Sequence, residues 1–375
     1  MIWPPAENIC LPAPRQEVEP SIPALYHNMP LSSNGDSIVC DNVQSPDGEN
    51  KMSTKIRILE LLEQHRGESI SGEQLAGICG ISRNAVWKAV KELQKDGYHI
   101  DAVTNKGYCL SEGNDIVSIP GIKPFLSEKS QPYASKIQIF KSLESTNTTA
   151  KEMAVAGAAH GTIVISDCQI MGRGRNSRHF FSPSGGLYMS IILRPEELCL
   201  ENPTAVTAFA AVAVCEAIES ISEKAPKIKW VNDIFMDGKK VCGILTEAVT
   251  DFESGGIDWI VLGIGINVYT RTEDFPDDLQ SIATSLFPEE KMPGVRNKLS
   301  AEIINRILGL ETSPNESEIF EKYKKRLMML GKEITVIQNQ MEFRATAIDV
   351  DSAGHLIVKN ENGEIIPLFS GEIRI

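Results

Sequence analysis

The stretch GRGRNSRHFFSPSGGLYMSIILRP, residues 172–195, carries the strongest fold signal in this 375-residue chain. Its first seven residues hold three arginines and two glycines and no acid. The apolar run 162–166 precedes it and a second apolar run, 187–193, lies within it. Runs of this length that are rich in β-branched and aromatic residues favour strands. The pattern therefore predicts a flexible, cationic loop between two strands of a sheet.

The composition of this loop indicates an anionic ligand. Arginine presents a planar fork that matches carboxylate and phosphate, and glycine permits close approach and a change of conformation. We therefore expect the loop to become ordered around a phosphorylated or carboxylated small molecule. Surface contact with nucleic acid and plain solvation remain open on spacing alone. Neither the P-loop pattern nor GxGxxG occurs here.

Length and charge limit the kind of protein. A chain of 375 residues predicts two to three domains. The net charge of −13 argues against general binding to DNA or acidic membranes, so any nucleic-acid contact needs a local patch. The 8 cysteines form no CxxC pair, which favours reduced thiols in the cytoplasm over a disulfide framework or a metal site. The chain shows no secretory signal and no evident membrane span, so we expect no membrane partner.

The N-terminal third divides into two parts. Residues 1–50 hold 8 of the 20 prolines and no apolar period, which predicts a disordered tail or sequence upstream of a start at Met52. Residues 51–112 show three helical patterns and then a hairpin signal at Asn105-Lys106-Gly107. This order is typical of a winged helix-turn-helix.

The third helical pattern of this domain, between Ser82 and Gly97, has an apolar face and a basic face. We expect the basic face and the wing to contact DNA through Arg83, Asn84, Lys88, Lys91, Lys95 and Lys106. Residues 51–112 carry 9 Lys/Arg against 8 Asp/Glu, a net charge of only +1, so firm binding would need a dimer. A small interaction module with a solvated lysine face is the alternative.

The rest of the chain predicts two further domains. Between 120 and 328 strands alternate with helices, which favours a mixed sheet. The expected strands are 137–140, 162–166, 187–193, 228–230, 241–247 and 259–268, and the expected helices are 148–159, 203–222 and 295–310. Short links at Gly185-Gly186 and Asp237-Gly238 suggest hairpins. Residues 329–375 read as short strands with turns, typical of a small barrel.

Two polar segments of the middle domain, ESTN (144–147) and KWVNDIF (229–235), are candidate ligand sites. Thr146 and Asn147 lie where a helix cap is expected, and cap residues can equally bind a small polar ring. Asn232 and Asp233 fit an ordinary strand-to-turn boundary. Asn can also pair with an adenine edge, and Asp can hold an ammonium group or a metal.

Two more segments, GKKVCGILTE (238–247) and VLGIGINV (261–268), also permit either an ordinary structural role or a ligand contact. Lys240 directly precedes an apolar strand, where it would face either an anion or, by extending its side chain, the solvent. Gly263 and Gly265 inside a strand mark either a bulge or the close approach of a ligand. Asn267 is a second candidate contact for adenine.

In this order, the segments ESTN, GRGRNSR, KWVND, GKKVCGILTE and GIGIN are far more specific than any one of them. The chain resembles the bifunctional biotin–protein ligases that also act as biotin operon repressors, over residues 52–375. The resemblance implies an α+β multidomain fold: the winged helix-turn-helix, a mixed-sheet catalytic domain like that of class II aminoacyl-tRNA synthetases, and a small SH3-like C-terminal barrel.

The resemblance also implies a two-step reaction. Biotin, a substrate, reacts with ATP in the presence of Mg²⁺ to give biotinyl-5′-adenylate, and a lysine of a biotin carboxyl carrier protein then takes the biotinyl group. No tightly bound cofactor is implied. Operator DNA is the second partner, and the adenylate-bound protein is expected to form a homodimer.

Residue roles follow by matching the family motifs. The implied biotin contacts are Ser145, Thr146, Asn147, Gln169, Gly172, Arg173, Gly174, Arg175, Lys240, Gly263 and Gly265. The implied ATP contacts are Arg175, Arg178, Phe180, Lys229, Asn232 and Asn267. The implied catalytic residues are Lys240, Arg173, Arg175 and Asp233, with Asp233 placing the acceptor amine.

Two departures from the family pattern concern packing rather than charge. Phe180 stands where the family often has tryptophan, and Val231 stands where it has proline. Two other functions stay in view. A lipoate–protein ligase shares the fold but should have an RRxSGGGxVxH-type loop. A biotin-sensing transcription factor without ligase activity should lack the charges that Arg173 and Lys240 supply.

Overall fold

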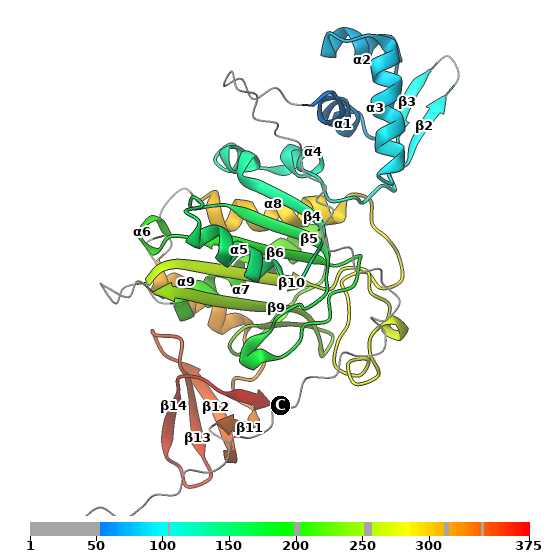
Figure 1. The fold of residues 1–375 in the computed structure, drawn as a ribbon. Helices are drawn as coiled ribbons and strands as arrows, with labels where there is room; N and C mark the ends of the chain where they lie inside the picture. The colour runs from blue at the N-terminus through cyan, green and yellow to red at the C-terminus, as the bar shows by residue number, and fades with distance from the viewer. Residues whose placement is uncertain (1–52, 104–105, 199–202, 251–256, 311–314, 339–340) are drawn as a thin grey trace, which may run out of the picture. The chain divides into compact units, whose positions relative to one another are not determined.

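The computed structural model describes residues 53–103, 106–198, 203–250, 257–310, 315–338 and 341–375. The predicted N-terminal tail, residues 1–50, lies outside the described residues, as does Asn105 of the predicted wing turn. Three sheets of 3, 7 and 5 strands organise the described chain (Figure 1).

Residues 54–110 form the predicted winged helix-turn-helix. Its elements are α1 (Thr54–Gln64), β1 (Ser69–Ile70), α2 (Gly72–Cys79), α3 (Arg83–Lys95), β2 (Ile100–Val103) and β3 (Gly107–Leu110). The predicted capping box is present, because the Ser71 side chain accepts from the Gln74 backbone and the Gln74 side chain accepts from the Ser71 backbone. Ser82 caps α3. The three helices bury an apolar core of their own.

The central sheet is mixed, as predicted. Its order is β4-β5-β6-β10-β9-β8-β7, with β4 and β5 parallel and the other neighbours antiparallel. The strands are β4 (Ile137–Leu143), β5 (Ile163–Gln169), β6 (Leu187–Leu193), β7 (Lys227–Lys229), β8 (Asp233–Met236), β9 (Lys239–Thr250) and β10 (Ile257–Ile266).

The two predicted hairpin links have different outcomes. Asp237 and Gly238, both with positive φ, join β8 to β9 as predicted. The prediction at Gly185-Gly186 is wrong, because these residues end the long connection 170–186 between β5 and β6. Strand β8 was not predicted, because Asn232-Asp233 fits a turn and so hides the start of the strand at Asp233.

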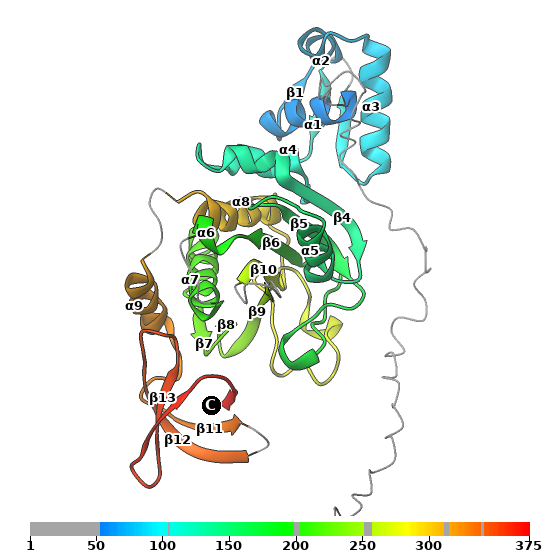
Figure 2. The same ribbon diagram turned by 60° about the vertical axis from the view of Figure 1, so that its left-hand side comes forward.

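Helices cover both faces of the central sheet (Figure 2). Helices α7 (Pro203–Ile221) and α8 (Val295–Leu308) share the main core with Ile163 and Ile165, whereas α5 (Thr146–Val155) packs on Val164 at the other face. Helix α7, predicted as a helix at 203–222, is long and apolar enough to cross a membrane, a property that the sequence prediction did not note. Because 72% of its apolar window is buried inside the protein, its composition fits a core helix.

The remaining elements complete the central and C-terminal parts of the chain. Three helices of this part were not predicted: the short helices α4 (Ile119–Ile122) and α6 (Pro195–Leu198), and α9 (Glu316–Arg326). The C-terminal strands are β11 (Glu333–Gln338), β12 (Met341–Val350), β13 (Leu356–Asn360), β14 (Ile365–Leu368) and β15 (Glu372–Arg374), all antiparallel, in the order β14-β13-β12-β11-β15. The Trp230 indole donates to the carbonyl of Gly354, 3.0 Å away, and so ties this sheet to the end of β7.

Candidate active site

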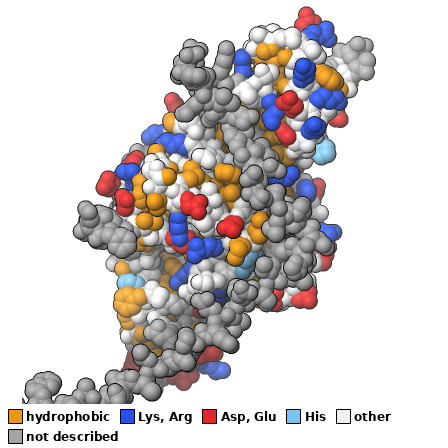
Figure 3. Space-filling model, in the orientation of Figure 1, with side chains coloured by type: hydrophobic (Ala, Val, Ile, Leu, Met, Phe, Trp, Pro, Cys, Tyr) orange, Lys and Arg blue, Asp and Glu red, His pale blue; other side chains and the backbone are white. Residues whose placement is uncertain are grey.

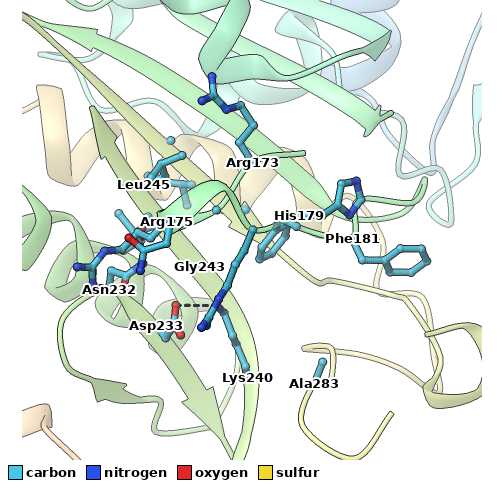
Figure 4. A pocket seen from close by; sticks show the side chains of 18 of the residues that line it. Arg173, Arg175, His179, Phe181, Asn232, Asp233, Lys240, Gly243, Leu245 and Ala283 are labelled. Atoms are coloured by element: carbon cyan, nitrogen blue, oxygen red, sulfur yellow. Dashed lines mark hydrogen bonds and ion pairs between the residues drawn. The ribbon is translucent and has the colours of Figure 1, made fainter. Parts of the chain in front are cut away.

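A cavity of about 280 Å³ opens at the end of the central sheet that carries the predicted ligand segments (Figure 4). The start of α5, the cationic loop, the β7–β8 connection, β9, β10 and the beginning of β15 all contribute to its walls. Every predicted biotin, ATP or catalytic residue lines the cavity except Gly172. The tertiary fold therefore brings together segments that lie more than 200 residues apart in sequence.

Buried hydroxyl and amide groups form one wall of the cavity. The Gln169 side-chain oxygen accepts from the Thr146 backbone at 2.8 Å and from its hydroxyl at 3.1 Å. Ser190 lies 2.7 Å from the Thr146 hydroxyl and 2.6 Å from Asn147 Oδ1. Asn147 in turn donates to Glu247 at 2.8 Å. A fixed set of donors and acceptors of this kind suits a polar ring such as a ureido group.

The two strand glycines are required by what lies against them. A Cβ on Gly263 would stand 2.0 Å from Asn147 Oδ1, and a Cβ on Gly265 would stand 2.8 Å from the Phe180 ring. A side chain at either position would displace a neighbour that shapes the cavity. Close approach, rather than a bulge, is therefore the reason for the glycines, although the neighbours are protein groups.

The cationic loop folds into a narrow turn. Gly174 donates to the Arg178 carbonyl and Phe180 donates to the Gly172 carbonyl, both at 2.8 Å, and Asn176 and Ser177 at the tip have positive φ. Arg173 and Arg175 point in different directions (Figure 4). Arg175 donates to Asn232 Oδ1 at 3.3 Å. Burial raises the pKa of Glu247, but hydrogen bonds from Lys151 and Asn147, aided by the charge of Arg173, outweigh it and hold that pKa below its usual value.

Arg178 connects the loop to the C-terminal sheet. Its guanidinium forms an ion pair with Glu372 at the start of β15. The hydrogen bond from Arg178 is the main reason that the pKa of Glu372 is lowered, and the same bond raises the pKa of Arg178. Sequence reasoning missed Glu372, because an acid in a short terminal strand carries no local signal.

Lys240 turns into the cavity instead of extending to solvent. Its ammonium group lies 2.6 Å from Asp233 Oδ1 and 5.8 Å from the centre of the Phe180 ring. Its backbone is fixed by hydrogen bonds to Ile282 and Thr284 on the facing loop. Burial lowers the pKa of nearby Lys229, and Asp233 and Glu372 partly oppose this. Cations therefore crowd one side of the cavity.

The two asparagines predicted to contact adenine differ in which of their side-chain atoms can still bind a ligand. Asn232 donates to the carbonyl of Ile244 at 2.6 Å and accepts from Arg175, so its amide is already engaged. Asn267 donates to the carbonyl of Thr284 at 3.1 Å. Its buried Oδ1 has no partner among the described residues and is available to accept from an exocyclic amine.

The structure adds cavity residues that sequence reasoning missed. Phe275, Leu279, Ile282 and Ala283 come from the segment after β10 and supply an apolar wall. Ring contact between Phe181 and Phe275, with centroids 6.0 Å apart, joins this wall to the cationic loop. Nothing in the local pattern of residues 275–283 distinguishes them from an ordinary surface loop.

The six predicted DNA-contact residues lie apart from this cavity, in the winged helix-turn-helix. Five of them lie on α3, and Lys106 lies in the wing between β2 and β3. All six side chains are exposed, and the apolar face of α3, with Val86, Ala89, Val90 and Leu93, is buried as predicted.

Comparison with known proteins agrees with this architecture. Three family descriptions match the chain: an HTH domain at residues 54–109, the biotin/lipoate A/B protein ligase family at 139–267, and the biotin protein ligase C-terminal domain at 329–374. The bifunctional ligase/repressor BirA of Bacillus spizizenii is 34% identical over 332 residues, which is 85% of this chain and 97% of the relative. BirA of Bacillus subtilis is 42% identical over 61% of this chain and 69% of the relative.

A solved structure shows the same fold. The biotin protein ligase of Aquifex aeolicus, in complex with biotin and ATP, superposes with a TM-score of 0.55 at 29% identity. The match covers 64% of this chain and 97% of the Aquifex chain. With its helix-turn-helix, its mixed-sheet ligase fold and its C-terminal antiparallel sheet, the chain belongs to the family of bifunctional biotin–protein ligases and repressors.

Proposed function

We propose that this chain joins biotin to a lysine of a biotin carboxyl carrier protein at the expense of ATP, and that its adenylate-bound form represses transcription. The observation that carries the proposal is the pairing of two features in one cavity. A buried amide and hydroxyl wall at Thr146, Asn147 and Gln169 faces a side rich in cations. The first feature suits the neutral ring of biotin and the second suits its carboxylate and the phosphates of ATP.

In the first step a biotin carboxylate oxygen attacks the α-phosphorus of ATP. The new O–P bond forms as the bond to the bridging oxygen breaks, and pyrophosphate leaves. Lys240 and Arg175 flank the region where negative charge develops, and Arg178 lies toward β15. Preorganised cations in a site closed from water stabilise that charge more than solvent does. Asn267 Oδ1, with no partner among the described residues, supplies an acceptor for the adenine amine.

In the second step the carrier lysine amine attacks the acyl carbon of the adenylate. The C–N bond forms, the acyl C–O bond to the phosphate breaks so that AMP leaves, and the proton lost by the amine passes to solvent. The Asp233 carboxylate, 2.6 Å from Lys240, lies at the cavity edge and is the group we assign to hold the incoming amine. Neither step needs a side-chain nucleophile, and no cysteine lines the described cavity.

Mg²⁺ would enter with the triphosphate. The described residues hold no group of three or more His, Cys, Asp or Glu that could bind a metal alone. Two carboxylates line the cavity, Asp233 and Glu372, which fits an ion held mainly by phosphate oxygens and water. Bound there, Mg²⁺ would neutralise phosphate charge.

Exchange of labelled pyrophosphate into ATP tests the ligase function. We expect exchange that depends on biotin and is absent with lipoate, because the hydroxyl and amide wall fits a ring with N–H and C=O groups. Exchange with lipoate alone would instead make the protein a lipoate ligase. No exchange with either acid would favour a transcription factor without ligase activity.

The repressor function concerns operator DNA and the oligomeric state. The exposed basic face of α3 supports DNA contact, and the small net charge of the domain supports a requirement for two copies, formed on adenylate binding through the central sheet. The cytoplasm is the location we assign, since the five described cysteines are all free thiols.

A further inference from the structure

Trp87, on the recognition helix α3, differs from the other described tryptophans in its exposure. Trp87 is 49% exposed, whereas Trp230 and Trp259 are each 5% exposed. Its ring makes no aromatic, cation–π or hydrogen-bond contact with the described residues. A large aromatic side chain left in water in this way commonly marks a surface that another molecule covers.

The surroundings of Trp87 identify the class of that molecule. Arg83 and Lys91 stand four residues before and after it, so the three form one ridge along the helix. Lys95 continues the same ridge, four residues after Lys91, whereas Lys88 lies on the neighbouring ridge together with Glu92, the single acid of α3. Figure 3 shows basic and hydrophobic side chains, with some acidic ones, intermixed on this domain.

Four cations beside one exposed ring favour a polyanion over a protein partner. None of the four forms an ion pair with the described residues, so their charges are free for phosphate. Among the described residues, Lys91 donates only to the neutral side chain of Gln94, at 3.0 Å. Trp87 is also the fifth residue of α3, within the N-terminal half that contacts base edges in helix-turn-helix proteins.

We infer that Trp87 is a sequence-reading residue, which packs its ring against thymine methyl groups in the major groove of the operator. Contacts from Lys and Arg to phosphate carry no sequence information, whereas an apolar contact to the C5-methyl group distinguishes thymine from the other bases. The inference rests on the proposed repressor function, because it assigns the residue that gives that function its sequence preference.

The test starts from DNA that the protein itself selects. Full-length protein with biotin and ATP is used to select duplexes from a random pool, and wild type, Trp87→Ala, Trp87→Phe and Lys91→Gln are then titrated with the selected duplex. We expect Trp87→Ala to weaken binding about tenfold with an unchanged salt dependence, and Trp87→Phe to recover part of the loss. Lys91→Gln should weaken all sequences and reduce the salt slope by about one.

Replacement of thymine by uracil isolates the methyl contact. Uracil at each thymine in turn should weaken wild type about fourfold at the contacted positions, the effect of one buried methyl group. The same replacement should leave Trp87→Ala unaffected, because the two changes remove one shared contact. Pyrophosphate exchange should be equal in all variants, since α3 contributes nothing to the ligase cavity.

The outcomes separate the inference from the function on which it rests. If wild type selects a duplex but Trp87→Ala binds it equally well, the repressor function stands and the role of Trp87 is wrong. An equal uracil penalty in wild type and Trp87→Ala would also overturn it. If wild type selects no sequence under any condition, both the repressor function and this inference fail.

Discussion

Lys240 shows how one residue acquires its role from its neighbours. The side chain follows an exposed turn and precedes the buried strand residue Val241, so its local sequence also permits it to point to solvent. Backbone hydrogen bonds to Ile282 and Thr284 instead fix its direction, and Asp233 balances its charge. An anionic ligand can compete with Asp233 for Lys240, because Asp233 is only partly buried. We expect the ammonium group to leave Asp233 and to contact the reacting carboxylate and phosphate oxygens instead.

Lys240→Gln should abolish adenylate formation without unfolding the protein. Removal of a preorganised charge from a transition state costs on the order of 10²–10³ in rate. Pyrophosphate exchange measures the effect, and thermal unfolding checks the fold. The matched control is Lys239→Gln, because the Lys239 ammonium donates to the carbonyl of Gln280 and to no other group in the described part of the chain, and its loss should not affect exchange. Equal losses in both variants would argue against a special role for Lys240.

Gly263→Ala should impair the use of biotin more than that of ATP. Its Cβ would stand 2.0 Å from Asn147 Oδ1, so the buried amide must move and its hydrogen bonds to Ser190 and Glu247 must weaken. We expect the KM for biotin to rise at least about tenfold, a loss of about 1.4 kcal/mol, with a smaller change in the KM for ATP. Gly77→Ala, where a Cβ would meet nothing within 4 Å, is the control.

At the scale of elements, the cationic loop is held at both ends and free at its tip. The backbone hydrogen bonds of Gly174 and Phe180 close its base, and Arg178 reaches Glu372 on β15. The tip at Asn176 and Ser177 has positive φ, a conformation that is unfavourable for residues other than glycine. A ligand that engages the arginines would therefore add the contacts that the tip lacks.

Trypsin should detect this ordering. Arg173, Arg175 and Arg178 are cleavage sites in the loop, and the rate of cleavage there follows the population of open conformations. Biotin with ATP should slow cleavage at these sites by at least about tenfold, and biotin alone should slow it less, since fewer arginines would be engaged. Cleavage after Lys332, in the turn before β11, serves as the internal reference. Unchanged cleavage of the loop with the adenylate bound would contradict the proposed mechanism.

The Arg178–Glu372 pair gives the loop a pH-dependent link to the C-terminal sheet. Because Arg178 lowers the pKa of Glu372 from its usual 4.5, the pair stabilises the folded state above pH 4.5 and loses this effect as the pH falls through the lowered value. The two side chains are 65% and 33% exposed, so Glu372→Gln should cost less than about 1 kcal/mol at pH 7. The difference between wild type and variant in urea unfolding should shrink below pH 4.5. Glu361→Gln, at an exposed acid with no ion pair among the described residues, should show no such trend.

At the scale of the whole molecule, charge is divided unevenly. Residues 51–112 carry +1 and the rest of the chain carries −14, the two adding to the net −13. Phosphate contacts supply most of the affinity for DNA, so a single copy of the DNA-binding domain, with a net charge of only +1, is expected to bind DNA weakly. Two copies double the number of phosphate contacts and match a two-fold symmetric site.

Adenylate should therefore control both assembly and DNA binding. Sedimentation should show a monomer without ligands and a dimer with biotin plus ATP, and gel-shift titration of the selected duplex should follow the dimer. Lys240→Gln, which cannot form adenylate, should remain monomeric with biotin plus ATP but dimerise when biotinyl-5′-adenylate is supplied. DNA binding that ignores both ligands would contradict this regulation.

Sequence patterns alone predicted the domain order and most of the elements. The apolar period of α3, the capping box before α2 and the strand at 187–193 are local features, and local propensity and periodicity determine them. The resemblance to the biotin–protein ligases depends on short polar segments that lie in loops or begin or end a strand or helix.

Only the tertiary structure decided how these segments meet. Glu247, Ser190 and Glu372 belong to the site although their local sequences resemble any strand, because their roles come from partners 40 or more residues away. The same holds for Lys240, whose direction depends on the loop at 282–284, and for the glycines of β10, whose necessity depends on Asn147 and Phe180. Periodicity reports which face of an element is buried, whereas the identity of the group across the cavity is fixed only when the sheet has formed.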